Sequence, residues 1–312
     1  MSRPLSRLVA SLLVAVAASA CQEEGLQGSR YDGPIIDVHL HAHDEIWADR
    51  RPCKPAPCQD TPTLATSGDE LKSMTLAAMA ANRIVLGVVS DAPDRVFAWT
   101  DEDERFLAGV SLRTPDEMKL GELRQLFTSG RAQVLGELTA QYANIPIDDP
   151  SMDPLFAVAS ELDLPVHVHL LGGGGSSDFP VHLGSPLRLV PVLRKYPGLR
   201  IQVENSGWPF LEDMIAVMYQ FPSVYGDIST ILTHRPPLVA LRYLQGLVDN
   251  GLGKRIMFGS DQMIWPETIG LAVDLIQGAD FLTREQKADI FYNNAATFLR
   301  LSDEEIARHR GG

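Results

Sequence analysis

The chain has 312 residues, of which 45% are hydrophobic and 21% are charged, as is ordinary for a globular protein with a full core. Its formal net charge is -13, and no segment gathers the Lys and Arg that a phosphate-binding face requires. We therefore expect one large α/β domain and no nucleic-acid partner.

Residues 1–20 have the features of an export signal. Arg3 and Arg7 precede an apolar stretch at 8–17, which is too short to span a bilayer comfortably. The small residues 18–20 form a cleavage site, and Cys21 follows directly. The segment thus resembles a bacterial lipoprotein signal, which predicts export to the periplasmic side and a lipid on Cys21 as the only membrane attachment. Secretion with cleavage but no lipid is the alternative.

Two further cysteines lie in a proline-rich loop after the first predicted strand. An exported protein meets an oxidising compartment, so we expect a local disulfide between Cys53 and Cys58. A cysteine metal site is the weaker alternative, because two thiols do not complete a tetrahedral set. Residues 21–33 are polar with Gly and predict a tether, and residues 34–312 predict the folded domain.

Strand-like and helix-like segments alternate through that domain. Most strand candidates are nearly continuous apolar runs, as expected for strands that are covered on both faces. The predicted strands are Ile35–His39, Ile84–Ser90, Phe106–Leu112, Gln133–Leu138, Val166–Leu170, Arg200–Asn205, Val224–Ile228 and Arg255–Ser260.

Helical patterns separate these strands, and several begin with Pro or Asp, as helix N-termini do. A short helix is expected within 91–105. The other predicted helices are 69–82, 116–128, 153–162, 186–195, 209–220, 237–249, 267–277, 284–299 and 304–309. Eight strands, each followed by a helix, predict a single-domain (β/α)8 TIM barrel. A doubly wound open sheet is the alternative, although no glycine-rich nucleotide loop follows the first strand.

Polar residues gather where the predicted strands end, and in a barrel those ends meet at one mouth. His39 and His41 alternate at the end of the first strand, so both imidazoles point to the same side. His167 and His169 repeat this placement on the fifth strand. Glu137 ends the fourth strand, and Asp261 follows the eighth.

Histidine and carboxylate ligands that converge with an open position for water meet the needs of a Zn²⁺-type site. Such a metal lowers the pKa of its water, and Asp261 can either ligate the metal or take the proton. The same ligands accept other divalent metals.

Four segments together resemble the amidohydrolase superfamily, and specifically its amidohydrolase-related branch of metal-dependent hydrolases and decarboxylases similar to aminocarboxymuconate-semialdehyde decarboxylase. They are the first-strand motif at 36–41, the fifth-strand motif at 164–169, the eighth-strand motif at 258–261 and the terminal helix at 293–299. The resemblance covers about residues 34–300.

The resemblance implies metal ligation by His39, His41, His169 and Asp261, with Asp261 also accepting a proton. Glu137 stands where some branches place a carboxylate ligand, and the alternative is a buried carboxylate beside the ligands. His167 is expected one layer deeper, behind the ligands or in the core.

One position departs from the family pattern. Related sequences usually have His at the end of the sixth strand, where this chain has Asn205, next to Glu204. Asn can donate a hydrogen bond to a carbonyl oxygen, which makes Asn205 a candidate catalytic residue, but it is a poor ligand beside His. The change therefore favours one metal ion over two.

These observations predict an exported metal-dependent hydrolase that directs water at a carbonyl-type carbon of a small molecule. A non-oxidative decarboxylase on the same site is one alternative. A non-catalytic lipoprotein that binds a ligand at the barrel mouth is another, and Asn205 keeps it open.

Overall fold

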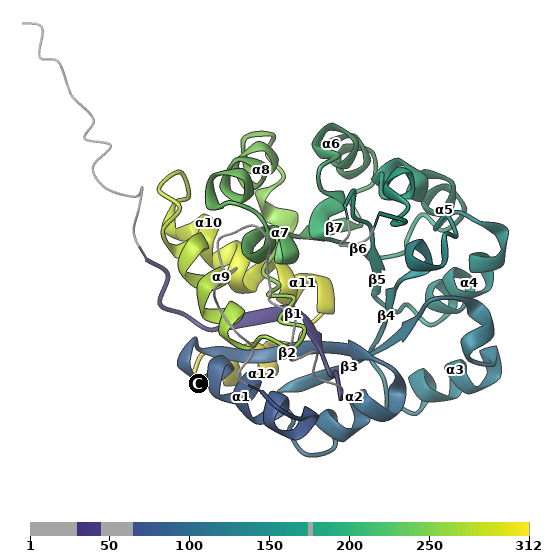
Figure 1. The fold of residues 1–312 in the computed structure, drawn as a ribbon, viewed down its shortest axis with the longest axis horizontal. Helices are drawn as coiled ribbons and strands as arrows, with labels where there is room; N and C mark the ends of the chain where they lie inside the picture. Colours follow the sequence, from purple (N-terminus) through teal and green to yellow (C-terminus); the bar gives the residue numbers. More distant parts are fainter. Residues whose placement is uncertain (1–29, 45–64, 174–176, 312) are drawn as a thin grey trace, which may run out of the picture.

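Eight parallel strands pair in the order in which they occur in the chain (Figure 1). The computed structural model describes residues 30–44, 65–173 and 177–311. The strands are β1 (Ile35–His41), β2 (Ile84–Asp91), β3 (Phe106–Leu112), β4 (Val134–Leu138), β5 (Val166–His169), β6 (Ile201–Glu204), β7 (Val224–Asp227) and β8 (Ile256–Met257).

Backbone hydrogen bonds join β1 to the chain that follows β8. Val38 N donates to Phe258 O at 3.0 Å, and Asp261 N donates to His39 O at 2.9 Å. The sheet is therefore a nearly closed barrel, which confirms the predicted (β/α)8 fold and excludes the doubly wound sheet.

Helices cover the outside of the strand ring (Figure 1). None in the described ranges is both long and apolar enough to cross a membrane. The helices are α1 (Gly68–Ala81), α2 (Pro93–Thr100), α3 (Leu120–Thr128), α4 (Asp153–Glu161), α5 (Val190–Lys195), α6 (Leu211–Gln220), α7 (Ser229–His234), α8 (Pro237–Asp249), α9 (Glu267–Gln277), α10 (Arg284–Ala288), α11 (Asn294–Leu299) and α12 (Asp303–His309).

The local sequence explains several helix starts. The Ser67 side chain accepts a hydrogen bond from Glu70 N and caps α1. Thr283 with Gln286, and Ser302 with Glu305, form reciprocal capping boxes at α10 and α12. Such caps satisfy backbone N–H groups that lack partners inside the helix.

Three differences from the prediction lie in the C-terminal part of the chain, and the predicted helices 116–128 and 186–195 begin later, at Leu120 and Val190. The predicted strand 255–260 is only two residues long, and Phe258 N donates to Ile290 O in the C-terminal segment and not to a neighbouring strand. The helix α7 was not predicted. The predicted helix 284–299 is divided by a wider π-helical turn at Asp289–Asn293.

Alternation along the strands separates the packing residues from the polar ones. On β5, Val166 and Val168 belong to the large core that the helices cover, whereas His167 and His169 take the other face. On β6, Val203 belongs to that core and Glu204 alternates with it. The strand ends thus present buried polar side chains to the barrel interior.

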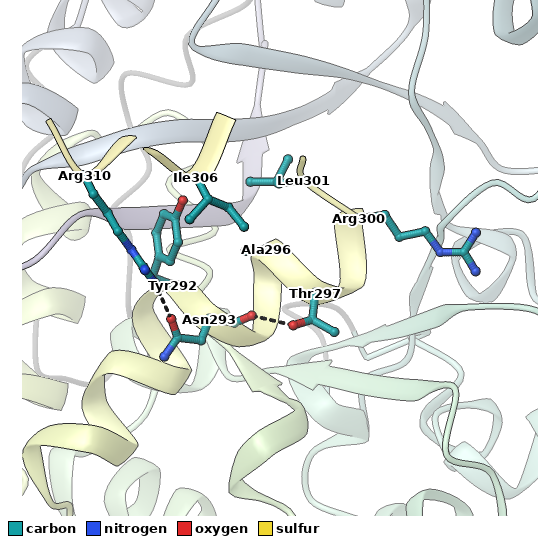
Figure 2. A pocket seen from close by; sticks show the side chains of 8 residues that line it. All are labelled: Tyr292, Asn293, Ala296, Thr297, Arg300, Leu301, Ile306 and Arg310. Atoms are coloured by element: carbon teal, nitrogen blue, oxygen red, sulfur yellow. Dashed lines mark hydrogen bonds between the residues drawn. The ribbon is translucent and has the colours of Figure 1, made fainter. Parts of the chain in front are cut away.

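A second, smaller core closes the other end of the barrel. Phe298 and Tyr292 of the C-terminal segment pack with Ile36, Val38 and Met257 from β1 and β8. A pocket of about 250 Å³ lies against this segment (Figure 2). It is lined by Tyr292, Asn293, Ala296, Thr297, Arg300, Leu301, Ile306 and Arg310. Since it holds neither His nor carboxylate, this pocket is not the predicted site.

Candidate metal centre

The predicted ligands come together at the carboxyl ends of the strands. His39, His41 and Glu137 each offer one ligand atom, and these atoms lie within 4.8 Å of one another. Glu137, His169 and Glu204 form a second such group, so Glu137 is shared between the two. All these side chains are buried. Residues from β1, β4, β5 and β6 therefore meet in one place.

Asp261, four residues after the end of β8, joins this cluster. One of its oxygens, Oδ1, lies 3.1 Å from His41 Nε2 and 3.7 Å from His39 Nε2. Thr230 Oγ1 donates a hydrogen bond to its other oxygen, Oδ2. His169 Nδ1 lies 2.5 Å from Glu137 Oε1. The structure thus gathers all five predicted ligand residues, and their ligand roles stay predictions.

His39 is oriented from behind by the carboxylate that ends β7. Its Nδ1 lies 3.2 Å from Asp227 Oδ2 and 2.9 Å from Ser229 Oγ. A hydrogen bond to the carboxylate keeps a proton on Nδ1, so Nε2 is the nitrogen that would bind a metal. Asp227 also accepts hydrogen bonds from Gln202 Nε2 and Asn205 N, at 2.7 and 2.8 Å. This carboxylate therefore holds His39 in the orientation that metal-binding histidines adopt.

Two further contacts fix the chain around the cluster. Asp37 Oδ1 accepts from His39 N at 3.1 Å and from Ser260 N at 3.0 Å, which ties β1 to the segment that carries Asp261. The Gln262 amide makes two hydrogen bonds with the His41 backbone. Both contacts position ligands without competing for their side-chain atoms.

Several buried atoms in the cluster lack hydrogen-bond partners within the described chain. They are His39 Nε2, His169 Nε2 and both carboxylate oxygens of Glu204. An unsatisfied buried polar atom costs about 1–3 kcal/mol, and more when it is charged. Imidazole nitrogens and carboxylate oxygens are the donors that Zn²⁺ and similar ions take. The residues present therefore fit a divalent metal.

The pKa shifts of the clustered side chains also favour a bound divalent cation. Burial raises the pKa of the Glu204 carboxyl well above its usual value, and the nearby Glu137 raises it further. Burial lowers the pKa of His39, but Glu204, Asp261 and Asp227 more than reverse this effect and leave it well above normal. Both shifts have the same cause, which is the crowding of several carboxyl groups in a buried space, and a divalent cation would stabilise their ionised forms.

Asn205 lies at the end of β6, fully buried, with a backbone φ of 58°. Its Oδ1 accepts hydrogen bonds from Thr230 N and Ser229 Oγ, at 3.1 and 3.2 Å. Its Nδ2 has no partner in the described chain. Asp261 also has a positive φ, of 48°. Non-glycine residues in this region are uncommon and cluster at functional sites, so both backbones are consistent with a site role.

His167 lies behind the cluster, as expected from its place on β5. Its ring centroid is 5.9 Å from that of Phe298, in the core at the closed end of the barrel. Burial lowers its pKa to about 3, so the imidazole is neutral. Its Nδ1 is 3.5 Å from Glu204 Oε1.

Glu204, Tyr142 and Ser229 had no predicted role. Glu204 could have been found from period-two alternation, because it shares the inward face of β6 with Gln202 and pairs in register with His169. Tyr142, half-exposed after β4, has its ring centroid 4.8 Å from that of His169. No motif marks Tyr142 or Ser229.

The predicted lipid site at Cys21 and the predicted disulfide between Cys53 and Cys58 lie outside the described residues. The same holds for the predicted export signal and for most of the tether.

Comparisons with known proteins agree with this fold. A family model described as "Amidohydrolase" matches residues 36–301. No curated protein sequence matches the chain. Among solved structures, a putative amidohydrolase from Staphylococcus aureus has a TM-score of 0.60 and 19% identity, with 86% of this chain and 100% of that chain covered.

Two further structures carry the names of different reactions. The 2,6-dihydroxybenzoate decarboxylase from Rhizobium has a TM-score of 0.58 and 16% identity, with 86% of this chain and 99% of that chain covered. A probable 2-pyrone-4,6-dicarboxylic acid hydrolase from Acinetobacter baumannii has a TM-score of 0.58 and 13% identity, with the same coverage of 86% and 99%. At these identities the likeness establishes the fold alone.

Proposed function

The chain belongs to the amidohydrolase family, and from that premise we propose that it is a metal-dependent hydrolase of a small molecule. One observation carries the proposal. Imidazoles and carboxylates from β1, β4 and β5, with Asp261 after β8, meet in a buried cluster in which several donor atoms have no partner in the described chain. We propose Zn²⁺, because the donors are nitrogen and oxygen, and one ion per chain, because Asn205 stands where a ligand of a second ion would be expected.

When bound, the metal lowers the pKa of a water molecule to about 7 and polarises a carbonyl group. His39, His41, Glu137, His169 and Asp261 would hold it. In the hydrolysis that we propose, Asp261 takes a proton from the attacking water and passes it to the leaving group. The Thr230 hydroxyl holds one oxygen of this carboxylate, so the other faces the histidines.

Asn205 is the proposed donor to the substrate. Its Oδ1 is occupied by two hydrogen bonds, which fixes the amide and leaves Nδ2 free to donate. A preorganised donor that meets a developing oxyanion stabilises the transition state more than the ground state.

Elemental analysis of protein purified without added metal tests the site. We expect one divalent metal per chain, and loss of that metal in the His39→Ala and His169→Ala variants. If either variant keeps full occupancy, that ligand assignment is wrong.

A decarboxylase is the second candidate, because the same fold carries 2,6-dihydroxybenzoate decarboxylase. Product analysis across esters, lactones, amides and aromatic carboxylates separates the two reactions. Incorporation of ¹⁸O from labelled water supports hydrolysis. Release of CO₂ without such incorporation overturns it in favour of decarboxylation, and tight binding without turnover would favour a ligand-binding lipoprotein.

We also propose export and a lipid anchor on Cys21, on the basis of the N-terminal pattern of positive, apolar and small residues. Mass spectrometry of the mature protein should find a diacylated N-terminal cysteine. The Cys21→Ser variant should leave the membrane fraction. A wild-type protein that retains residues 1–20, or that carries no lipid, contradicts this proposal.

A further inference from the structure

Glu204 is an acidic residue that is buried in the barrel interior without a Lys or Arg partner in the described chain. It is the last residue of β6, completely buried, and it faces the interior next to His169 of β5. Neither carboxylate oxygen accepts a hydrogen bond from an N–H or hydroxyl group of the described chain. No Lys or Arg in these ranges forms an ion pair with it. A buried carboxylate without such compensation destabilises the fold, so a bound cation or a shared proton is needed to offset this cost.

The neighbours of Glu204 are imidazoles and another carboxylate. Its Oε1 is 3.9 Å from His39 Nε2 and 3.5 Å from His167 Nδ1. With Glu137 and His169 it forms a group whose ligand atoms lie within 4.8 Å of one another. His169 Nε2 and His39 Nε2 also lack hydrogen-bond partners among the described residues. Glu204 therefore faces nitrogen atoms that are themselves available to a cation.

The distances suit a shared ion. Nitrogen and oxygen ligands bind Zn²⁺ at about 2.1 Å, so two ligands of one ion lie no more than about 4.2 Å apart. Glu204 Oε1 and Asp261 Oδ1 both fall within this limit from His39 Nε2, at 3.9 and 3.7 Å. We propose that Glu204 is a metal ligand, contributed by β6 to the ion that His39 and Asp261 bind. This assignment rests on the proposed function.

The rival explanation is a proton shared between Glu204 and Glu137, with no contact to metal. The Glu204→Gln variant separates the two, because the amide keeps the shape and a hydrogen-bond donor but loses the anionic oxygen. Glu161→Gln is the matched control, since Glu161 is exposed on α4 and pairs with Arg124.

Three measurements on the full chain test the ligand role. We expect the Zn²⁺ affinity of Glu204→Gln to fall by about 100-fold or more. Loss of a group that only orients a ligand lowers metal affinity by roughly 10–100-fold, so loss of a direct ligand should reach or exceed the upper end of that range. The visible absorption spectrum of the Co²⁺-loaded protein should change, because a ligand has changed. The melting temperature of the metal-free variant should equal or exceed that of wild type, because the amide has the same shape and removes a buried acidic group that has no Lys or Arg partner.

Unchanged Zn²⁺ affinity and an unchanged Co²⁺ spectrum in Glu204→Gln, with metal bound normally by wild type, would overturn the assignment of Glu204 alone. A lower metal-free melting temperature with an unchanged Co²⁺ spectrum would also overturn it, since that is the mark of a structural role. Failure of the wild type to bind any divalent metal would instead overturn the proposed function itself. The Glu161→Gln control should match wild type in all three measurements.

Discussion

At the scale of single residues, His39 shows how one side chain is divided between two tasks. Its Nδ1 is held by Asp227 and Ser229, and its Nε2 is left without a partner in the described chain. The sequence motif predicted that His39 faces the barrel interior. It could not reveal which nitrogen is free, because the group that decides this is 188 positions away in the chain.

Asp227→Asn tests this orienting contact. The substitution removes the charge that holds the Nδ1 proton, so we expect metal affinity to fall by roughly 10–100-fold. Isothermal titration with Zn²⁺ measures the change. Equal affinities for variant and wild type would show that Asp227 does not set the orientation of His39.

Asn205→Asp tests the proposed donor. Aspartate keeps the oxygen that accepts from Thr230 and Ser229, but it replaces the free N–H donor with an acceptor. We expect kcat to fall by about 10²–10³-fold, as for the loss of one oxyanion donor. Metal content, measured on the same preparation, should stay at the wild-type level. A wild-type kcat would exclude Asn205 from the chemistry.

At the scale of elements, the site depends on how closely β1, β7 and the segment after β8 approach one another. Gly259 sits at this junction, where a Cβ atom would lie 2.8 Å from His39 Cβ and 3.4 Å from Asp227 Cγ. The segment after β8 can approach β1 and β7 this closely only because residue 259 has no side chain. Asp37 ties β1 to the segment after β8, because its Oδ1 accepts hydrogen bonds from both His39 N and Ser260 N.

Gly259→Ala should displace His39. We expect a loss of about 1–3 kcal/mol in the free energy of unfolding, as for overpacking, together with lower metal occupancy. Gly121→Ala is the control, because a Cβ there meets nothing within 4 Å and the residue lies in α3, where Ala is favoured by about 1 kcal/mol. Urea unfolding should show opposite signs for the two variants. Equal stability of Gly259→Ala and wild type would contradict the steric argument.

Asp37→Ala should leave two buried backbone N–H groups without their acceptor, which costs about 1–3 kcal/mol each. Asp37→Asn keeps that oxygen and should cost less than half as much. Chemical denaturation of both variants measures the difference. Similar losses of stability in the two variants would show that the oxygen acceptor at residue 37 does not account for the stabilisation.

At the scale of the whole molecule, one end of the barrel carries the candidate site and the other end is filled by a hydrophobic core. Phe298 and Tyr292 fill the end where the strands begin, and the histidines and carboxylates lie where the strands finish. The metal site draws on strands from across the whole barrel, so binding should stabilise the entire domain.

Removal of metal should therefore lower the melting temperature. At a free metal concentration 100 times Kd, binding stabilises the native state by about 2.7 kcal/mol. For a domain of this size, that amounts to roughly 5–10 °C. Calorimetry with and without a chelator measures the shift, and His169→Ala should show none. An equal shift in this variant would place the metal elsewhere.

Sequence alone determined the barrel and five residues of the candidate site. Apolar runs that alternate with capped helices specify a parallel sheet covered on both faces, and His-x-His at a strand end presents both rings to one side whatever surrounds them. These are local properties with a short period. The tertiary structure alone decided which groups Glu204 and Asp227 contact and how closely the chain passes at Gly259, although alternation along β6 already places Glu204 on the inward face. Their roles depend on which strands become neighbours when the barrel closes, and on which buried atoms are then left without a partner.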